Sequence, residues 1–305
     1  MFYNIRNKIQ RAKFNWMVRG ILTTPPQPAG EGPGAILSVV SAADIAMYLV
    51  AVKSLHSRLP QLRIIIIDDG TLHPKDRDIL SRHLPGATLI ARDEIVLGSL
   101  PPDLMWQRLA CVIAASAEGF VIQLDSDTVT IGAVDVVRNC IEQNRSFIMA
   151  TQECPQIQPL PVAVKFAEGH PSRHIQIVAE QAMANLPGAG MLRYIRGSAG
   201  FFGLAPGAVT LGQAEELFAR MDALTSGRFL EWGAEQFGAN FLVANTPEAC
   251  ALPYPGYAVF DPGCDPDKAV FLHFIGAYRF DRDVYAYFAQ KILAELTQVS
   301  RDKIA

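Results

Sequence analysis

Residues 35–70 read AILSVVSAADIAMYLVAVKSLHSRLPQLRIIIIDDG, and the predicted fold class follows from their pattern. Its first six residues, 35–40, form an apolar run that predicts a buried strand. Residues 44–59 then space their apolar side chains as a helix does, and residues 62–67 form a short β-branched run that predicts a second strand. A strand, a helix and a strand in this order indicate a parallel sheet covered by helices.

The same alternation continues after this stretch. Residues 74–83 and 103–117 are expected to be helices, and residues 87–90 and 120–124 are expected to be strands. Beyond Gly132 the pattern loosens into mixed strands, helices and connections rich in proline and glycine. The predicted fold class is α/β, a Rossmann-like mixed but mostly parallel sheet with helices on both faces, whose functional residues gather at the carboxyl ends of the strands.

The composition is that of a globular protein of 305 residues, half of them apolar, which is enough to bury a large core. The formal net charge of −3 lacks the positive field that a long nucleic-acid backbone requires, so nucleic acid is not an expected partner. Five cysteines without a CxxC pair indicate reduced thiols, and therefore a cytoplasmic protein.

The N-terminal segment is basic, and its apolar residues are too dispersed for a signal or a transmembrane segment. We expect residues 1–34 to be a basic segment with a linker at 25–34, residues 35–290 to be the main domain, and residues 291–305 to be a C-terminal helix end. An ordinary helix that packs on the body is the favoured interpretation of the basic segment. A basic amphipathic helix in peripheral contact with the inner face of a membrane is the alternative.

The strongest local motif is FVIQLDSDTVTIG at residues 120–132, where an apolar strand delivers two carboxylates into a turn. Alternate side chains of a strand share a face, so Asp125 and Asp127 can both present oxygens to one hard cation, Mg²⁺ or Mn²⁺. A solvated turn capped by its own aspartates is the favoured interpretation of the tripeptide alone. The apolar strand before it shifts the balance toward the edge of a cleft.

A second motif, AVFLHFIGAYRF at residues 269–280, sets His273 at the end of an apolar strand, followed by Gly276 and Arg279. Imidazole is a competent Mn²⁺ ligand, and a guanidinium fits the oxygens of a diphosphate. A hydrogen-bonded core histidine is the alternative for His273 taken alone. Together with the aspartates, it completes the predicted metal ligands, which are Asp125, Asp127 and His273.

Taken in order, these motifs resemble the retaining glycosyltransferases of family 8, the glycogenin and lipopolysaccharide-galactosyltransferase group, which have the GT-A fold. The resemblance runs from Ile36 to Phe280. WQRL at 106–109 is similar to the family's Tyr/Phe-x-Arg-Leu, RGSAGFFGL at 196–204 to its Asn-Ser/Ala-Gly stretch, AEQFGANF at 234–241 to its Asp-Gln-Asp-x-x-Asn, and HFIGAYRF at 273–280 to its His-Phe-x-Gly-x-x-Lys-Pro. Several positions depart from the family: Ser198 replaces asparagine, Glu235 replaces aspartate, Arg279 replaces lysine and Phe280 replaces proline.

The resemblance implies transfer of a sugar from a nucleotide diphosphate, with UDP favoured, to a saccharide, lipopolysaccharide or glycolipid acceptor with retention of configuration. It places Gln236 and Glu235 at the donor sugar. The acceptor site is expected in the irregular half of the chain beyond Gly132. Asp68 and Asp69, which the resemblance assigns to the nucleotide, are equally well explained by an ordinary tight turn. The full set of residues that it implies for donor binding is Ala42, Asp44, Asp68, Asp69, Arg108, Ser126, Ser198, Gly200, Gly276 and Arg279.

Two alternatives stay open. LDSDTV at 124–129 also fits the motif of haloacid-dehalogenase-type phosphohydrolases, with Asp125 as the covalent nucleophile, although that motif normally lies on the first strand and here follows three strand-like segments. The other alternative is a protein that binds nucleotide sugars without turning them over.

Overall fold

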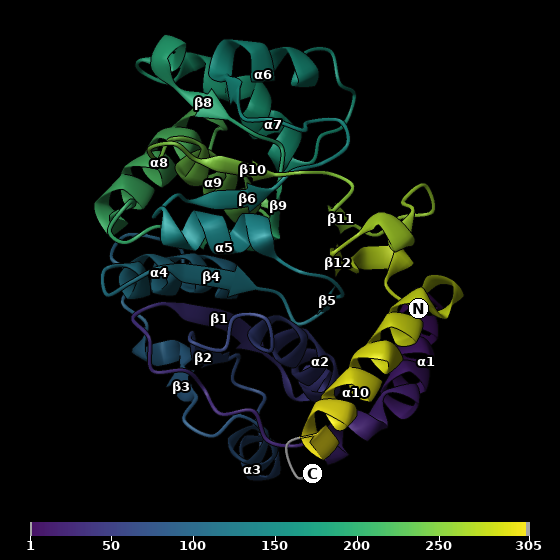
Figure 1. Cartoon of the computed structure of the whole chain (residues 1–305). Coiled ribbons are helices and arrows are strands. Elements are labelled where there is room, and N and C mark those ends of the chain that lie inside the picture. The colour runs from purple at the N-terminus through teal and green to yellow at the C-terminus, as the bar shows by residue number, and fades with distance from the viewer. Residues whose placement is uncertain (1, 303–305) are drawn as a thin grey trace. The chain divides into compact units, whose positions relative to one another are not determined.

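The computed structural model describes residues 2–302, apart from the side chains of residues 2–7, 277 and 299–302. The chain divides into two compact units and crosses between them more than once (Figure 1). Unit 1 comprises residues 1–91, 124–134 and 255–305, and unit 2 comprises residues 92–123 and 135–254.

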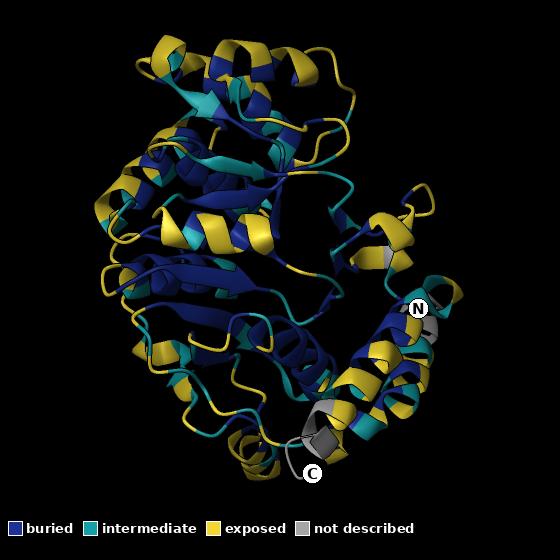
Figure 2. Ribbon diagram, in the orientation of Figure 1, coloured by how far each residue is buried: buried dark blue, intermediate teal, exposed yellow. Residues whose placement is uncertain are grey.

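Unit 1 begins with the strand, helix and strand that the sequence predicts. β1 (Ala35–Val40) and β2 (Arg63–Asp68) pair in parallel, and α2 (Ile45–His56) connects them. α3 (Pro74–His83) then leads to β3 (Thr88–Ala91), which is parallel to β2. Nearly every side chain of β1, β2 and α2 is buried, and most of them are apolar. Figure 2 shows the same contrast between buried strands and the surface helices, which are exposed on one side.

A second, smaller sheet of unit 1 has the strand order β11-β12-β5. Its strands are β5 (Thr128–Thr130), β11 (Tyr257–Val259) and β12 (Phe271–His273). β12 is parallel to β11 and antiparallel to β5. This sheet joins the segment that follows the Asp-x-Asp motif to a strand from the C-terminal part of the chain.

Helix α1 (Phe2–Met17) packs against α10 (Val284–Asp302) within unit 1 (Figure 1). Phe14 is 3% exposed, and its ring centroid lies 4.4 Å from that of Tyr285. The N-terminal segment therefore packs on the rest of unit 1. The side chains of residues 2–7, which form part of the amphipathic pattern, lie outside the described residues. Among the helices that the structure describes, none is both long enough and apolar enough to cross a membrane.

The expected linker at residues 25–34 lies along unit 1 and is held there by its backbone. Gln27 N donates to the carbonyl oxygen of His83, and Gly30 N donates to that of Leu62, each at 2.9 Å. A Cβ at Gly30 would lie 2.3 Å from the carbonyl carbon of Gln61, so only glycine fits this close approach. The predicted boundaries at 34 and 290 stay predictions, and residues 303–305 of the predicted C-terminal end lie outside the described residues.

Unit 2 holds strands in the order β10-β6-β9. β10 (Cys250–Leu252) and β6 (Phe147–Met149) are parallel, whereas β6 and β9 (Ser198–Leu204) are antiparallel. Helices α4 (Leu104–Ser116) and α9 (Ala234–Ala244) enclose a cluster of aromatic rings formed by Trp106, Phe218, Phe229 and Phe237. Unit 2 also holds α5 (Asp135–Glu142), β7 (Gln158–Pro159), α6 (Leu160–Ala167), α7 (Ile175–Ala182), β8 (Arg193–Tyr194) and α8 (Leu211–Leu224).

All the elements predicted between residues 35 and 124 are present, and the α/β class with a mixed, mostly parallel sheet is confirmed. The largest difference is the end of α2, which stops at His56 instead of residue 59. The residue before a proline is disfavoured in helical conformation, which argues against Leu59 as a helical residue.

Candidate functional site

The turn at residues 125–127 connects β4 (Val121–Leu124) to β5. Thr128 Oγ1 donates to the carbonyl oxygen of Asp125 at 2.9 Å, and Ser126 Oγ donates to the carbonyl oxygen of Val39 at 3.1 Å. The Tyr285 hydroxyl lies 3.4 Å from the carbonyl oxygen of Ser126 and 3.3 Å from that of Thr128. These bonds hold the backbone of the turn in one conformation. Ser126 is expected at the donor, but its hydroxyl donates a hydrogen bond to the backbone of β1.

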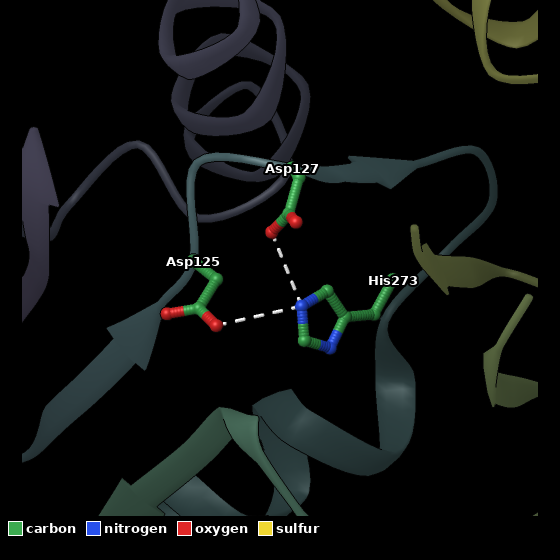
Figure 3. Close-up of side chains that lie close together, drawn as sticks. All are labelled: Asp125, Asp127 and His273. Carbon is green, nitrogen blue, oxygen red and sulfur yellow. Dashed lines mark hydrogen bonds and ion pairs between the residues drawn. The ribbon is translucent and has the colours of Figure 1, made fainter. Parts of the chain in front are cut away.

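Strand β12 brings the histidine to this turn. His273 lies opposite Thr128 in the antiparallel pair, and Phe274 N donates to the carbonyl oxygen of Asp127 at 2.8 Å. His273 is 4% exposed, and its Nε2 lies 3.1 Å from Asp127 Oδ1 and 3.4 Å from Asp125 Oδ2 (Figure 3). The structure thus brings the three predicted metal ligands together.

The spacing of these atoms suits one cation. An octahedral ion with bonds of about 2.1 Å holds neighbouring ligands about 3.0 Å apart, close to the 3.1 and 3.4 Å measured from Nε2. One ligand atom from each of the three residues lies within 4.8 Å of the others. Two carboxylates and one imidazole are donors that suit Mn²⁺ or Mg²⁺, with further positions left for water or phosphate oxygens.

Arg279 extends this cluster. Its NH2 lies 2.6 Å from Asp127 Oδ2, and its Nε donates to the carbonyl oxygen of Phe274 at 3.1 Å. Each oxygen of Asp127 therefore has its own partner, with Oδ1 facing His273 and Oδ2 facing the guanidinium. Gly276, at the start of a short 3-10 helix (Gly276–Tyr278), is exposed and has a positive φ of 54° that favours glycine.

Opposing influences act on the imidazole of His273. Burial by itself lowers its pKa, but the charges and hydrogen bonds of Asp127 and Asp125 outweigh burial and raise the pKa to about 9. Without a metal, His273 is therefore an imidazolium at neutral pH. A cation bound through Nε2 has to displace this proton.

Mn²⁺ binding is therefore expected to weaken as the pH falls, by about tenfold per pH unit below the pKa of His273. The metal-free protein should respond with the opposite sign. Because the folded pKa is raised, the ion pair contributes stability that is complete below a pH of about 6.5 and is lost as the pH rises through about 9. Calorimetric Mn²⁺ titrations and urea unfolding in EDTA across this range would measure both slopes. A His273→Gln variant should flatten them, and parallel slopes in both proteins would contradict the assignment.

The predicted donor residues at the ends of β1 and β2 lie in well-bonded turns. Asp44 accepts from Ser41 Oγ and from Arg11 NH1, each at 2.8 Å. Asp68 is 3% exposed and accepts from Gly70 N at 2.8 Å and from Arg77 NH2 at 2.7 Å. The half-buried Asp69 accepts from Thr71 N and Thr71 Oγ1 at 2.9 and 2.6 Å, and Thr71 Oγ1 also accepts from Ala42 N at 2.9 Å. Asp68 and Asp69 thus form the tight turn that the sequence offered as one of two interpretations.

In unit 2, Arg108 and Glu235 are paired with each other. Arg108 NH2 lies 2.5 Å from Glu235 Oε1, and both side chains are only 6% exposed. Ser198 is also buried, at the start of β9, and its Oγ accepts from Gly200 N at 3.4 Å. Gln236, next to Glu235 in the first turn of α9, is half-buried.

Sequence reasoning missed the residues that contact Gln236. Gln236 Nε2 donates to Gln176 Oε1 at 3.0 Å, and Gln176 Nε2 donates in turn to the buried carboxylate of Glu180. Gln176 lies 60 positions before Gln236, on a different helix. No spacing or motif in the sequence marks it.

No protein-family model matches the chain, and no curated protein sequence matches it. Solved structures do match. The galactosyltransferase LgtC, in complex with donor and acceptor sugar analogues, aligns with a TM-score of 0.51 and 11% identity over 87% of this chain and 95% of that one. The glycosyltransferase GlyE of Streptococcus pneumoniae aligns with a TM-score of 0.50 and 14% identity over 87% of this chain and 63% of that one.

At these identities the likeness concerns the fold. The GT-A-type α/β fold that the sequence predicts is confirmed. The phosphohydrolase alternative is not favoured, because the fold is of the GT-A type and because Asp125 follows the fourth strand of the chain.

Proposed function

We propose that this protein is a metal-dependent glycosyltransferase of the family 8 type, which moves a sugar from a nucleotide diphosphate, UDP in the first instance, to a saccharide or glycolipid acceptor with retention. The cluster of Asp125, Asp127 and His273 carries the proposal, because it offers a divalent cation three ligands in a GT-A-type fold. The galactosyltransferase that shares this fold has been solved with donor and acceptor sugar analogues, which supports a two-substrate transfer.

Breaking the bond between a sugar and a diphosphate develops negative charge on the leaving phosphate, and a site gains rate by stabilising that charge. A bound Mn²⁺ or Mg²⁺ would supply Lewis-acid stabilisation of this charge. The two aspartates and the neutral imidazole of His273 would hold the ion. Arg279 fixes the second oxygen of Asp127, and its side chain is 24% exposed, so the guanidinium can also face diphosphate oxygens.

For the remaining donor contacts we propose the residues that the family resemblance implies. Gln236 and Glu235 would face the sugar, with the carboxylate of Glu235 already held by Arg108. Ser198 and Gly200 would line the sugar pocket, and Ala42, Asp44 and the Asp68-Asp69 turn would meet the nucleotide.

A panel of nucleotide sugars, assayed for nucleoside diphosphate release with and without Mn²⁺, tests this function directly. Release that needs both Mn²⁺ and one donor supports the transferase. Hydrolysis of phosphomonoesters instead would support the phosphohydrolase. Donor-dependent thermal stabilisation in Mn²⁺ without any release of nucleoside diphosphate would indicate a protein that binds nucleotide sugars without turning them over.

Trp232 is a candidate contact for the acceptor. Its side chain is 81% exposed, and its ring stands edge-on to His174 at 5.8 Å, at the start of α7. An exposed aromatic face offers a sugar ring an apolar platform. Trp232→Ala is expected to raise the acceptor KM about tenfold, roughly 1.4 kcal/mol, and to leave donor hydrolysis unchanged. With a soluble saccharide as acceptor, Trp16→Ala, which removes an exposed tryptophan of unit 1, is the matched control. Equal effects of the two changes would remove Trp232 from the acceptor site.

We also propose a cytoplasmic location with peripheral membrane contact through the outer face of α1. Ile9 and Trp16 are 64% and 65% exposed, and the guanidinium of Arg19 lies 4.4 Å from the Trp16 ring centroid. Because Phe14 is in the core, deleting the helix would damage the fold. Trp16→Ser is expected to reduce co-sedimentation with phosphatidylserine vesicles several-fold without altering donor hydrolysis. Unchanged co-sedimentation would argue that α1 only packs on the body.

A further inference from the structure

A line of side-chain hydrogen bonds runs from α9 into the interior of unit 2. It begins at Gln236, whose Nε2 donates to Gln176 Oε1 at 3.0 Å. Gln176 Nε2 donates in turn to Glu180 Oε1 at 3.4 Å, one turn further along α7. Both amides donate their nitrogen toward the interior, and the oxygen of Gln176 accepts from Gln236.

Glu180 closes the line as a pure acceptor. It is 1% exposed, and Arg196 Nε lies 3.0 Å from each of its carboxylate oxygens, with Arg196 NH2 in contact with Oε2. The hydrogen bond that Arg196 donates to Glu180 raises the pKa of Arg196 despite burial. The Tyr194 hydroxyl donates to Oε1 at 3.0 Å, and burial first and then the charge of Glu180 raise the pKa of this phenol well above its usual value. Both donors therefore keep their protons across the physiological range.

This arrangement determines the direction of both amides. A carboxylate clamped by an arginine has no proton to give, so Gln176 can bond to it only through its NH2 group. The oxygen of Gln176 then faces Gln236, which can bond to that oxygen only through its own NH2 group. The carbonyl oxygen of Gln236 is consequently the end of the amide that α7 does not engage.

We propose that Gln176 and Glu180 are positioning residues that orient the amide of Gln236 so that its carbonyl oxygen, and not its NH2 group, faces the donor sugar. The inference rests on the proposed function. A sugar ring gains positive charge as its leaving group departs, as in glycoside hydrolysis, and a carbonyl oxygen stabilises that charge whereas an NH2 group opposes it. Without these hydrogen bonds the side-chain amide of Gln236 can rotate. Its carbonyl oxygen then faces the sugar in half of its orientations or fewer.

Kinetics of four variants test this role: Gln176→Leu, Gln236→Ala, the double variant, and Gln181→Leu as the matched control. Gln181 lies on the same helix and donates to the carbonyl oxygen of Ala167 at 2.8 Å, outside the line. Gln176→Leu is expected to lower kcat by about three- to tenfold, with the donor KM and the melting temperature matching those of Gln181→Leu. In the Gln236→Ala background, Gln176→Leu should have no further effect.

Two results would overturn the proposal. One is an equal loss of kcat from Gln176→Leu with and without Gln236, and the other is a loss equal to that of Gln181→Leu. A readout that needs no activity is the ¹⁵N-resolved side-chain NH2 signal of Gln236, which should shift on Gln176→Leu and not on Gln181→Leu. If wild-type protein releases no nucleoside diphosphate, the proposed function fails, and this spectrum still decides whether the line orients Gln236.

Discussion

Asp127→Ala is expected to lower Mn²⁺-dependent release of nucleoside diphosphate by about a thousandfold, since a catalytic cation contributes several kcal/mol to the transition state. Asp127 supplies one oxygen to the candidate cation site and uses the other to hold Arg279 at 2.6 Å. Its removal takes away a metal ligand and also frees the guanidinium. The measurement is kcat/KM for the donor over a Mn²⁺ titration.

Asp78→Ala is the matched control for this change, because it removes an exposed aspartate of the same unit, on α3, that lies outside the residues proposed for the donor and the metal. It should leave the Mn²⁺ dependence unchanged. Asp127→Ala should also lower the pKa of His273 in the metal-free protein, because the imidazole loses its strongest carboxylate partner while burial remains. Turnover that survives Asp127→Ala in saturating Mn²⁺ would remove the metal centre from the reaction.

Arg108→Met is expected to cost about 3–5 kcal/mol of the free energy of unfolding, the range for breaking one side of a buried ion pair. Arg108 and Glu235 are each 6% exposed, so the carboxylate cannot reach bulk water when its arginine is removed. Urea unfolding of unit 2, followed by tryptophan fluorescence, measures this loss.

The double variant Arg108→Met and Glu235→Leu separates structure from function. Two apolar side chains can replace a buried ion pair at little cost, so the double variant should recover most of the lost stability. If the pair also contacts the donor, donor hydrolysis should stay low in this stable protein. Full recovery of hydrolysis along with stability would assign the pair to the fold alone.

The sequence predicts the first half of unit 1 well because its signals are local. The apolar runs of β1 and β2 and the helical spacing of α2 each lie within one element, so periodicity alone locates them. The metal ligands are harder, because His273 and Asp127 are 146 positions apart and meet only through the pairing of β12 with β5. The order of the motifs predicted that these two residues come together, and the register of β12 on β5 explains how they do so.

Other parts of the site depend on partners that no pattern marks. The pairing of Arg108 with Glu235 spans 127 positions, and Gln176 reaches Gln236 from another helix. The turn at Asp68 and Asp69 is the opposite case. Its hydrogen bonds follow from the local sequence, but they do not decide whether a nucleotide also binds there. Long-range side-chain contacts are therefore the part of the site that required the structure.

The pairing of β12 with β5 has a consequence for folding. A growing chain exposes Asp125 and Asp127 long before His273 is synthesised, so the complete ligand set appears only after the small sheet has closed. A cation that binds the closed sheet more tightly than the open one stabilises this closure by mass action. Tight Mn²⁺ binding would then report that β12, the last strand, is in place. A slip of β12 by one residue would turn His273 to the opposite face and abolish Mn²⁺ binding.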